Sequence, residues 1–427
     1  MAEQTSLETP LPSSERTDVL DTPKRWWYLL GLSLSVMVGG VSSVCIKQLL
    51  LPIQTSQLAP QNTTLVFTLV ASVGAGAGLV ASPLVGALSD RTGWRLGRRR
   101  SWIALGIITA VLGMLLMAAS HTILLLVLGE ICAQVGVDSV LAVTTAVIPD
   151  QIPQTQRPFI SACAGMAPNV GGVIGLLLVA HLTDPGKVFE GYLLIAAVSL
   201  GCVLFFLLVL RDPPVASGEA LPSMRLGSFL VSVVQPLRSR DFCLTFVSRC
   251  CAYLSFTILG SYLLFYARGV LHDSLPDAAL HVANFQLLLT AVLLVGALLA
   301  GWLSQHLGHS KRFAIGGAGL MALGLGVIVV VPSWSALFLA AVLFGGGFGL
   351  FLGVDLALAV RVLPSPDARG KDLGLMYDAI YAPLILSPLI GGAVLSLGQN
   401  DFALLFALAA FSALLAALFL LPLRAGR

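Results

Sequence analysis

Twelve long apolar runs constrain this chain of 427 residues more than any other feature of its sequence. A helix of about 20 apolar residues is long enough to cross the hydrocarbon core of a bilayer. The runs lie at 26–46, 65–88, 101–119, 122–147, 159–182, 190–210, 242–267, 284–305, 312–331, 334–362, 374–397 and 402–422. They predict an all-α membrane protein with twelve transmembrane helices. The even number predicts that both termini lie on the same side.

The composition supports a chain embedded in lipid and excludes several soluble classes. Hydrophobic residues make up 57% of the chain and charged residues only 11%, whereas soluble domains average about 45–50% and about 25%. A nucleic-acid binder is therefore excluded. The motifs H-E-x-x-H, G-x-S-x-G and G-x-x-x-x-G-K-[ST] do not occur in the sequence. We therefore expect no enzyme, no cofactor and no metal site.

The basic residues predict the orientation. Twenty of the 24 Lys and Arg residues lie in the tails or follow the second, fourth, sixth, eighth and tenth runs. Lys47, Lys187 and Arg268 lie on the opposite side, and Arg249 lies inside a run. Because positive charge is retained on the cytoplasmic side, both termini are predicted to be cytoplasmic in a multi-pass protein of the cell membrane. Lys47 is expected at the outer end of the first run, extending outwards.

An internal repeat divides the chain into two halves. Residues 136–143 read GVDSVLAV and residues 353–360 read GVDLALAV, in the fourth and tenth runs. The sequence therefore predicts two pseudo-symmetric six-helix bundles. The expected parts are a disordered cytoplasmic tail (1–25), a first bundle (26–210), a cytoplasmic linker (211–241) and a second bundle with a short cytoplasmic tail (242–427).

A short basic loop follows the second run. Its glycines and charges can lock one helix end to another on the cytoplasmic side and release it when the halves rock, and Gly86 is expected to allow close helix packing. The residues of this predicted cytoplasmic gate are Gly86, Asp90, Arg91, Arg95, Gly97, Arg98, Arg99 and Arg100. A generic positively charged membrane anchor is the alternative interpretation.

Through this loop the chain resembles the major facilitator superfamily. The spacing S-D-R-x-x-x-R-x-G-R-R-R is similar to that of the sucrose–proton symporter branch, a relative of the glycoside symporters, and its bacterial relatives. Trp94 departs from the commoner loop pattern, which has a basic residue there. Melibiose-type symporters bind sodium through acids on the second span, and none precedes Asp90 here. The resemblance therefore implies the major facilitator fold and coupling to protons.

Ionisable side chains inside a span are costly and need a reason. In the fourth run Glu130, Gln134 and Asp138 follow at i, i+4 and i+8, so they share one helix face,. Carboxyl groups sheltered from water can exchange protons near neutral pH, as a proton carrier must. We expect Glu130 or Asp138 to carry the coupled proton. The alternative is a structural role, with each carboxyl paired to a buried donor.

Two opposite charges lie at equal depth in the second half. Arg249 in the seventh run and Asp355 in the tenth are each about seven residues from the cytoplasmic end, which predicts an ion pair,. The repeat offset places Leu32 where the first half would need the matching cation. Asp138 is therefore less neutralised than Asp355.

Further polar residues are candidates for a substrate cavity. They are Lys47, Asn169, Tyr253, Tyr377, Asp378 and Tyr381. Asn169 belongs to Ala167–Gly172, which is similar to a motif of proton-coupled exporters. Because 387–392 has the same shape, duplicated helix packing is the preferred interpretation,.

The expected function is secondary active transport by alternating access. The first hypothesis is a proton-coupled symporter for a small polar solute, with a sugar or glycoside implied only by the resemblance. The alternative is a proton-driven exporter of multiple drugs or amphipathic compounds. The expected partners are a small-molecule substrate, protons and the lipid bilayer, and we expect the chain to function as a monomer.

Overall fold

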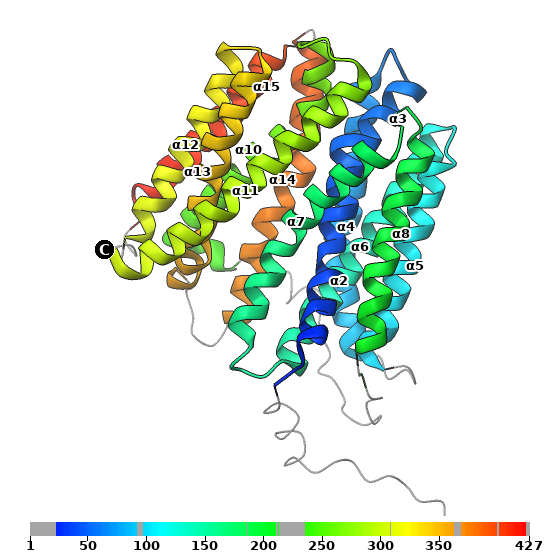
Figure 1. Cartoon of the computed structure of the whole chain (residues 1–427). Helices are drawn as coiled ribbons and strands as arrows, with labels where there is room; N and C mark the ends of the chain where they lie inside the picture. Colours follow the sequence, from blue (N-terminus) through cyan, green and yellow to red (C-terminus); the bar gives the residue numbers. More distant parts are fainter. Residues whose placement is uncertain are drawn as a thin grey trace, which may run out of the picture.

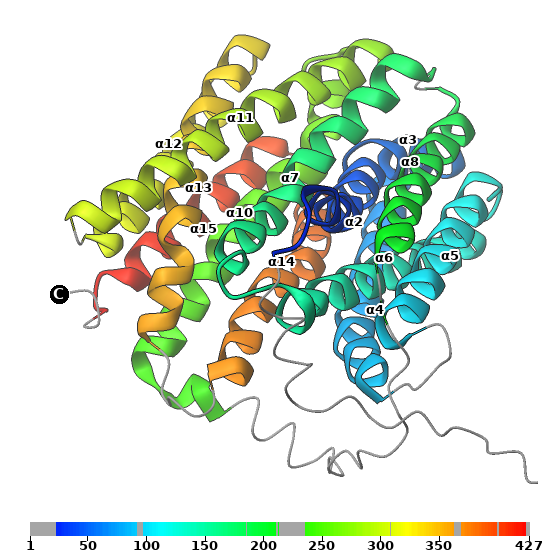
Figure 2. The same cartoon turned by 60° about the horizontal axis from the view of Figure 1, so that its bottom comes forward.

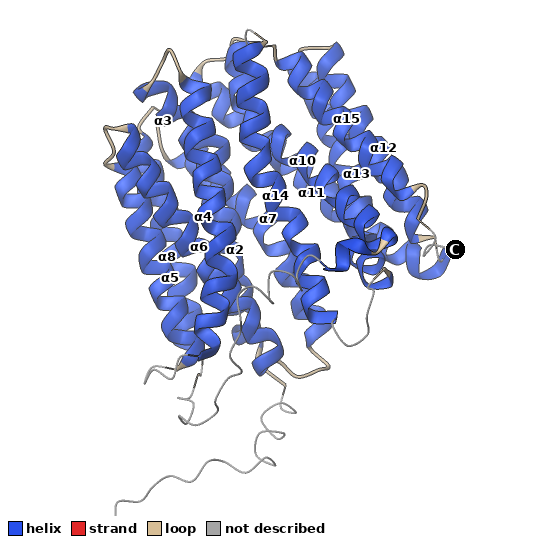
Figure 3. Cartoon of the chain, turned by 180° about the vertical axis from the view of Figure 1, so that it is seen from behind, coloured by secondary structure: helices blue, strands red, loops and turns tan. Residues whose placement is uncertain are grey.

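A computed structural model describes residues 23–91, 97–184, 186–210, 212, 235–307, 309–362, 369–398 and 401–423. Helices are the only regular secondary structure in these ranges (Figure 3). Twelve of the helical segments are long and apolar enough to cross a membrane, as the sequence predicts.

The first six spans occupy the first half of the chain. The first span consists of α2 (Trp26–Cys45), η1 (Ile46–Leu50) and α3 (Leu51–Leu58). The others are α4 (Thr63–Arg91), α5 (Arg98–Ala118), α6 (Ile123–Gln151), α7 (Arg157–Leu182) and α8 (Val188–Val209).

The second half follows a short 3-10 helix, η2 (Gln235–Arg238). Its six spans are α10 (Arg240–Gly269), α11 (Leu275–Leu307), α12 (Ser310–Val330), α13 (Trp334–Arg361), α14 (Arg369–Leu397) and α15 (Phe402–Leu420).

The first span is longer than the sequence predicted. It was expected to end at residue 46, but the helix continues through a π-helical segment, η1, to Leu58. Pro52 comes directly after the π-helical segment, where the regular α-helical hydrogen-bond pattern is already interrupted,. Lys47 lies within η1 and is only 9% exposed. The expectation that Lys47 extends outwards is therefore wrong.

The packing of the helices repeats between the halves. In the first half α2 packs on α7 and α8, α5 packs on α6 and α8, and α4 packs on α6. The equivalent pairs recur six spans later, where α10 packs on α14 and α15, α12 on α13 and α15, and α11 on α13. This recurrence confirms two pseudo-symmetric bundles, which lie side by side in Figure 1.

The bundles meet through two equivalent helix pairs. One is α4 with α14 and the other is α7 with α11. Figure 2 shows α2, α7, α10 and α14 toward the middle of the molecule, with α5 and α12 on opposite flanks. Groups on α4, α7, α11 and α14 are therefore placed to face the boundary between the halves, and so are groups on η1 and α10, which also contact each other.

Glycines bring the paired helices into close contact. A Cβ atom on Gly113 of α5 would lie 2.7 Å from the carbonyl oxygen of Gly129 in α6. At the equivalent contact in the second half, a Cβ on Gly317 would lie 2.5 Å from the carbonyl oxygen of Gly347. Such contacts between small residues let helix backbones approach one another in a membrane.

The duplicated motif of the fifth and eleventh spans also packs helices. A Cβ on Gly172 of α7 would lie 2.9 Å from Val44 of α2. A Cβ on Gly391 of α14 would meet the ring of Tyr262 in α10. The same motif thus serves the equivalent pairs α2–α7 and α10–α14, which supports the packing interpretation.

Candidate functional site

A buried polar face runs along α6. Glu130, Gln134 and Asp138 are all buried, and Gln134 Nε2 donates a hydrogen bond of 2.9 Å to Asp138 Oδ2. Their helical spacing places them on one face, as predicted. The contact also shows that Gln134 supports the Asp138 carboxyl directly.

Two glycines of α4 form the wall opposite this face. A Cβ on Gly74 would lie 2.5 Å from Glu130 Cγ, and a Cβ on Gly78 would meet Asp138 Oδ2. These glycines are four residues apart, so they share one face of α4. Neither glycine was predicted to belong to the site, although the run Gly-Ala-Gly-Ala-Gly at 74–78 is a visible signal.

Lys47 lies near both acids without touching either. Its ammonium acts electrostatically on Glu130 and on Asp138, but no ion pair of 4 Å or less joins them among the described residues. Glu130 is 1% exposed, and neither of its carboxyl oxygens has a hydrogen-bond partner in the described part of the chain. Such a sheltered carboxyl can accept a proton or a ligand without first breaking a hydrogen bond.

The π-helical segment η1 also connects the two halves. η1 packs on α10, and the side-chain nitrogen of Gln48 would be 2.6 Å from a Cβ on Gly260. Gln48 Oε1 is buried without a hydrogen-bond partner among the described residues. Segments of π-helix occur often at functional sites. This segment was not predicted, because its residues have the pattern of an ordinary helix.

The second half holds the predicted ion pair. Arg249 Nη2 lies 3.0 Å from Asp355 Oδ2, with side chains 6% and 5% exposed. The ion pair inferred from equal depth is therefore confirmed. Leu32, at the repeat position of Arg249, is fully buried in the apolar core. Asp138 thus has the amide of Gln134 as its neighbour where Asp355 has a cation.

Aromatic rings gather on the two helices that carry this pair. Phe256 of α10 stacks on Phe348 of α13 with ring centroids 4.7 Å apart, and Tyr253 meets Phe348 edge-on at 5.3 Å. The Arg249 guanidinium carbon lies 6.0 Å from the centre of the Tyr253 ring. The second half therefore offers an aromatic surface beside a neutralised ion pair.

The remaining cavity candidates are dispersed. Asn169 on α7 and Tyr381 on α14 are half-buried. The backbone places Tyr377 and Asp378 in α14, but their side chains lie outside the described part. The structure thus gathers Lys47 with the α6 acids, and Tyr253 with the ion pair.

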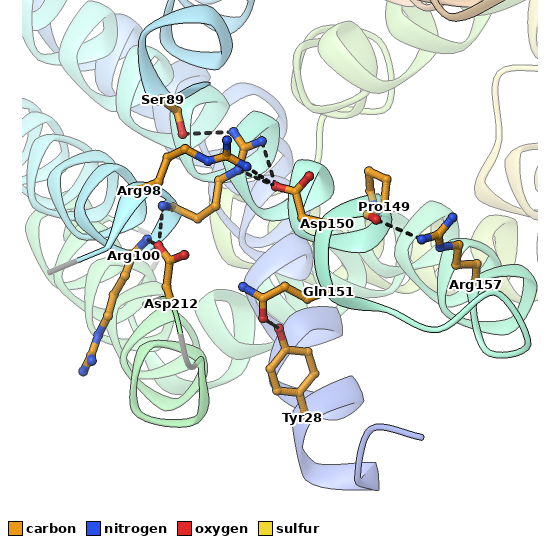
Figure 4. A network of polar contacts seen from close by, with 10 residues as sticks. Tyr28, Ser89, Arg98, Arg100, Pro149, Asp150, Gln151, Arg157 and Asp212 are labelled. Carbon is orange, nitrogen blue, oxygen red and sulfur yellow. Dashed lines mark hydrogen bonds and ion pairs between the residues drawn. The ribbon is translucent and has the colours of Figure 1, made fainter. Parts of the chain in front are cut away.

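The basic loop residues bind acids of the first half (Figure 4). Arg98 and Arg99 both pair with Asp150 at the end of α6, at 3.0 Å and 2.8 Å. Arg99 also donates to Ser89 Oγ. Ser89 is near the end of α4, so this arginine–carboxylate network ties α4, α5 and α6 together.

Asp212 completes the arginine–carboxylate network. Its carboxylate accepts hydrogen bonds from the backbone N–H groups of Arg99 and Arg100 (Figure 4) and so caps the N-terminus of α5,. Gly97 has φ of 97°, and a Cβ there would lie 2.6 Å from Asp212 Oδ2. Both its conformation and the nearby carboxylate therefore require glycine.

Other predicted gate residues differ or lie outside the description. A Cβ on Gly86 would meet no described atom within 4 Å, so the expected close packing at Gly86 is wrong. Arg95 and the side chains of Asp90 and Arg91 lie outside the described residues. The contacts seen join residues of the first bundle to one another and to Asp212 of the linker, and none reaches the second bundle among the described residues.

Two contacts fasten the start of α2 to the same network. Tyr28 Oη donates to Gln151 Oε1 at 2.7 Å (Figure 4). The backbone N–H of Lys24 donates to Gln156 Oε1 at 2.8 Å. Partial burial lowers the pKa of the Lys24 ammonium,. Lys24 and the first turn of α2 are thereby held against the end of α6 and the start of α7.

This architecture defines a class of protein. Twelve apolar helices form two pseudo-symmetric bundles, and each bundle buries charged side chains among its helices. Such an arrangement defines a membrane transporter built from parallel repeats. The sequence matches the profile of the Major Facilitator Superfamily in two overlapping regions, 30–292 and 245–427. The chain belongs to this superfamily and is a transporter rather than an enzyme.

The chain is similar to several curated transporters. It is 24% identical over 329 residues to the Fujikurins efflux protein of Gibberella fujikuroi, covering 75% of this chain and 65% of that protein. It is 23% identical over 389 residues to a triacylglyceride transporter of Mycolicibacterium smegmatis, covering 74% and 65%. The match thus spans less than two thirds of the length of these two relatives. A triacylglyceride transporter of Mycobacteroides abscessus is 26% identical over 416 residues, covering 78% and 75%.

Solved structures share the fold. The nucleoside transporter NupG superposes with a TM-score of 0.73 at 15% identity, covering 93% of this chain and 100% of that chain. A bacterial homologue of the human lysosomal transporter Spinster, inward-facing and unoccupied, gives 0.63 at 16% identity, covering 94% and 96%. At this identity the likeness shows the fold alone. The match is to the superfamily as a whole, and the sucrose–proton branch stays a prediction.

Proposed function

We propose that the chain is a proton-coupled exporter of amphipathic compounds that works by alternating access. The observation that carries this proposal is the unlike chemistry of the two halves. Lys47, Glu130 and Asp138 lie in the first half, and an aromatic surface with Tyr253 and Phe256 lies in the second. A compound with a polar end and an apolar body would match both surfaces.

The two surfaces are close enough to serve one cargo. η1 carries Lys47 and Gln48 and packs on α10, where Gln48 abuts Gly260. Phe256 is four residues before Gly260 on the same helix, so it shares that face about 6 Å along the axis. The efflux and lipid-transporting relatives also favour an amphipathic cargo over a sugar.

Glu130 and Asp138 are the proposed proton carriers. Asp355 is in contact with a cation, Arg249, whereas Glu130 has unpaired carboxyl oxygens and Asp138 is held by an amide. Lys47, near both acids, would compensate their charge when the proton leaves. A reversible change of charge at this boundary would bias the two halves between their arrangements.

The remaining parts of the proposal concern organisation. Both termini are proposed to be cytoplasmic, in a cell-membrane protein that functions as a monomer. The proposed parts keep the boundaries 26–210 and 242–427 for the bundles, with 1–25 as tail and 211–241 as linker. The arginine–carboxylate network, proposed to face the cytoplasm, would keep the first bundle rigid while the halves move.

The test uses the purified protein in proteoliposomes with an imposed proton gradient. The panel of radiolabelled compounds is tetraphenylphosphonium, dodecanoate, sucrose and uridine. Glu130→Gln and Asp138→Asn are expected to abolish accumulation against a gradient and to leave exchange intact. Glu190→Gln is the control, since that exposed glutamate pairs with Lys187 at the surface. Normal uphill accumulation by both variants would contradict the assignment of the carriers.

Symport of a small polar solute is the second candidate. The unpaired amide oxygen of Gln48 and the buried amide of Gln134 are groups that could bind sugar hydroxyls. The same vesicles distinguish the candidates. Sucrose accumulation driven by inward proton flow would support symport, whereas proton-driven accumulation of an amphipathic compound from the cytoplasmic side would support export.

A further inference from the structure

A pocket lies between the bundles at the end where α3 finishes and α4 begins. Its volume is about 390 Å³, within the range of small-molecule sites. Residues of both halves line the pocket, among them Ile53, Ser56, Thr64, Phe265, Arg268 and Phe402. These residues stand in the first or last two turns of their helices. The pocket therefore opens near the ends of the apolar spans.

Aromatic packing closes the pocket on its inner side. Phe67 of α4 meets Phe265 and Tyr262 of α10 with ring centroids 5.2 Å and 5.7 Å apart. Tyr262 Oη in turn donates to the carbonyl oxygen of Pro388 in α14. This aromatic plug, formed by Phe67, Tyr262 and Phe265, joins both bundles. Along α10 the plug lies between the pocket and Gly260, the glycine that faces Gln48.

Arg268 is the charged group of the pocket. It is exposed in the last turn of α10, and no ion pair or hydrogen bond engages its guanidinium among the described residues. Arg268 and Phe265 are three residues apart, so they share one helix face. The pocket thus combines an available fork of N–H donors with apolar walls.

We propose that this pocket is an outer binding site for an amphipathic anion. Arg268 would bind its carboxylate, sulfate or phosphate group, and Phe265 and Phe402 would pack on its apolar body. The occupant is a free anion that arrives from the aqueous side or is released to it. The reason is that the pocket lies between the bundles at the helix ends, on the outer side of the aromatic plug. Its role as a station on the transport path rests on the proposed function, but its binding does not.

The probe is a diazirine-bearing dodecanoate, photo-crosslinked to the full chain in phosphatidylcholine nanodiscs and mapped by mass spectrometry. We expect adducts within 52–64 and 264–275, and competition by dodecanoate but not by dodecanol. Arg268→Gln should reduce labelling about tenfold or more, since a charge-assisted hydrogen bond is lost, and Arg268→Lys should retain part of it. Lys187→Gln, at another outer cation, is the matched control.

Three results would overturn the inference. The first is labelling elsewhere, and the second is labelling that Arg268→Gln leaves unchanged. The third is loss of labelling when phosphatidylglycerol is added to the nanodiscs, because the pocket would then be a lipid site. Glu130→Gln should label normally, since no gradient is needed. Failure at the pocket would leave the transport assay unaffected, so the two proposals fail separately.

Discussion

Breaking the buried ion pair between Arg249 and Asp355 gives the sharpest test of the packing. The contact is 3.0 Å and both side chains are about 95% removed from solvent. Asp355→Asn removes one charge of this pair, and removing one partner of a buried ion pair costs about 3–5 kcal/mol. Since 1.4 kcal/mol is a factor of ten, the folded-to-unfolded ratio should fall roughly 100-fold to 1,000-fold or more. The double variant Arg249→Leu, Asp355→Leu should recover most of this loss.

The assay is unfolding in mixed micelles with increasing dodecyl sulfate, followed by tryptophan fluorescence. Lys187→Gln removes an exposed pair at 3.5 Å and should cost less than about 1 kcal/mol. Ser248→Ala removes a neutral hydrogen bond to the carbonyl oxygen of Ala416 and should cost about 0.6 kcal/mol. The prediction is contradicted if Asp355→Asn lowers the unfolding free energy no more than these controls do. It is also contradicted if the double variant is no more stable than Asp355→Asn.

Three smaller predictions follow. Gly113→Ala should lower the unfolding free energy by about 1–3 kcal/mol in the same assay, whereas Gly76→Ala, where a Cβ meets nothing described within 4 Å, should be neutral. Gly78→Ala should displace the Asp138 carboxyl and reduce uphill transport at least tenfold while the thermal midpoint stays near that of Gly76→Ala; equal transport by the two variants would contradict this. Asp150→Asn should speed amide hydrogen exchange at the start of α5, and unchanged exchange there would show that its two arginine contacts are dispensable.

Regular spacing made part of the site predictable. The shared face of Glu130 and Asp138 follows from helical periodicity, and the Arg249–Asp355 pair follows from equal depth on two spans. Both arguments need only straight helices of known direction. The repeat at 136–143 and 353–360 likewise predicted the equivalence of the halves, because duplicated sequence folds into duplicated packing.

Local irregularity and long-range contacts were not predictable in this way. Lys47 was misplaced because a charge after an apolar run resembles a span end, whereas the helix continues through η1. The partner of the α5 N-terminus is Asp212, more than 100 residues away, and no local pattern encodes that contact. Gly86 was expected to pack closely because of its motif, but Gly74 and Gly78 do so beside the acids.

The most direct test of the whole account is to measure whether protons move through the α6 acids. Proteoliposomes containing the pH dye pyranine are given a gradient of whichever panel compound the protein carries. The account predicts that cargo flow changes the internal pH, and that Glu130→Gln combined with Asp138→Asn abolishes this change while cargo exchange continues. Cargo flow without a pH change in the unaltered protein, or an undiminished change in the double variant, would contradict it.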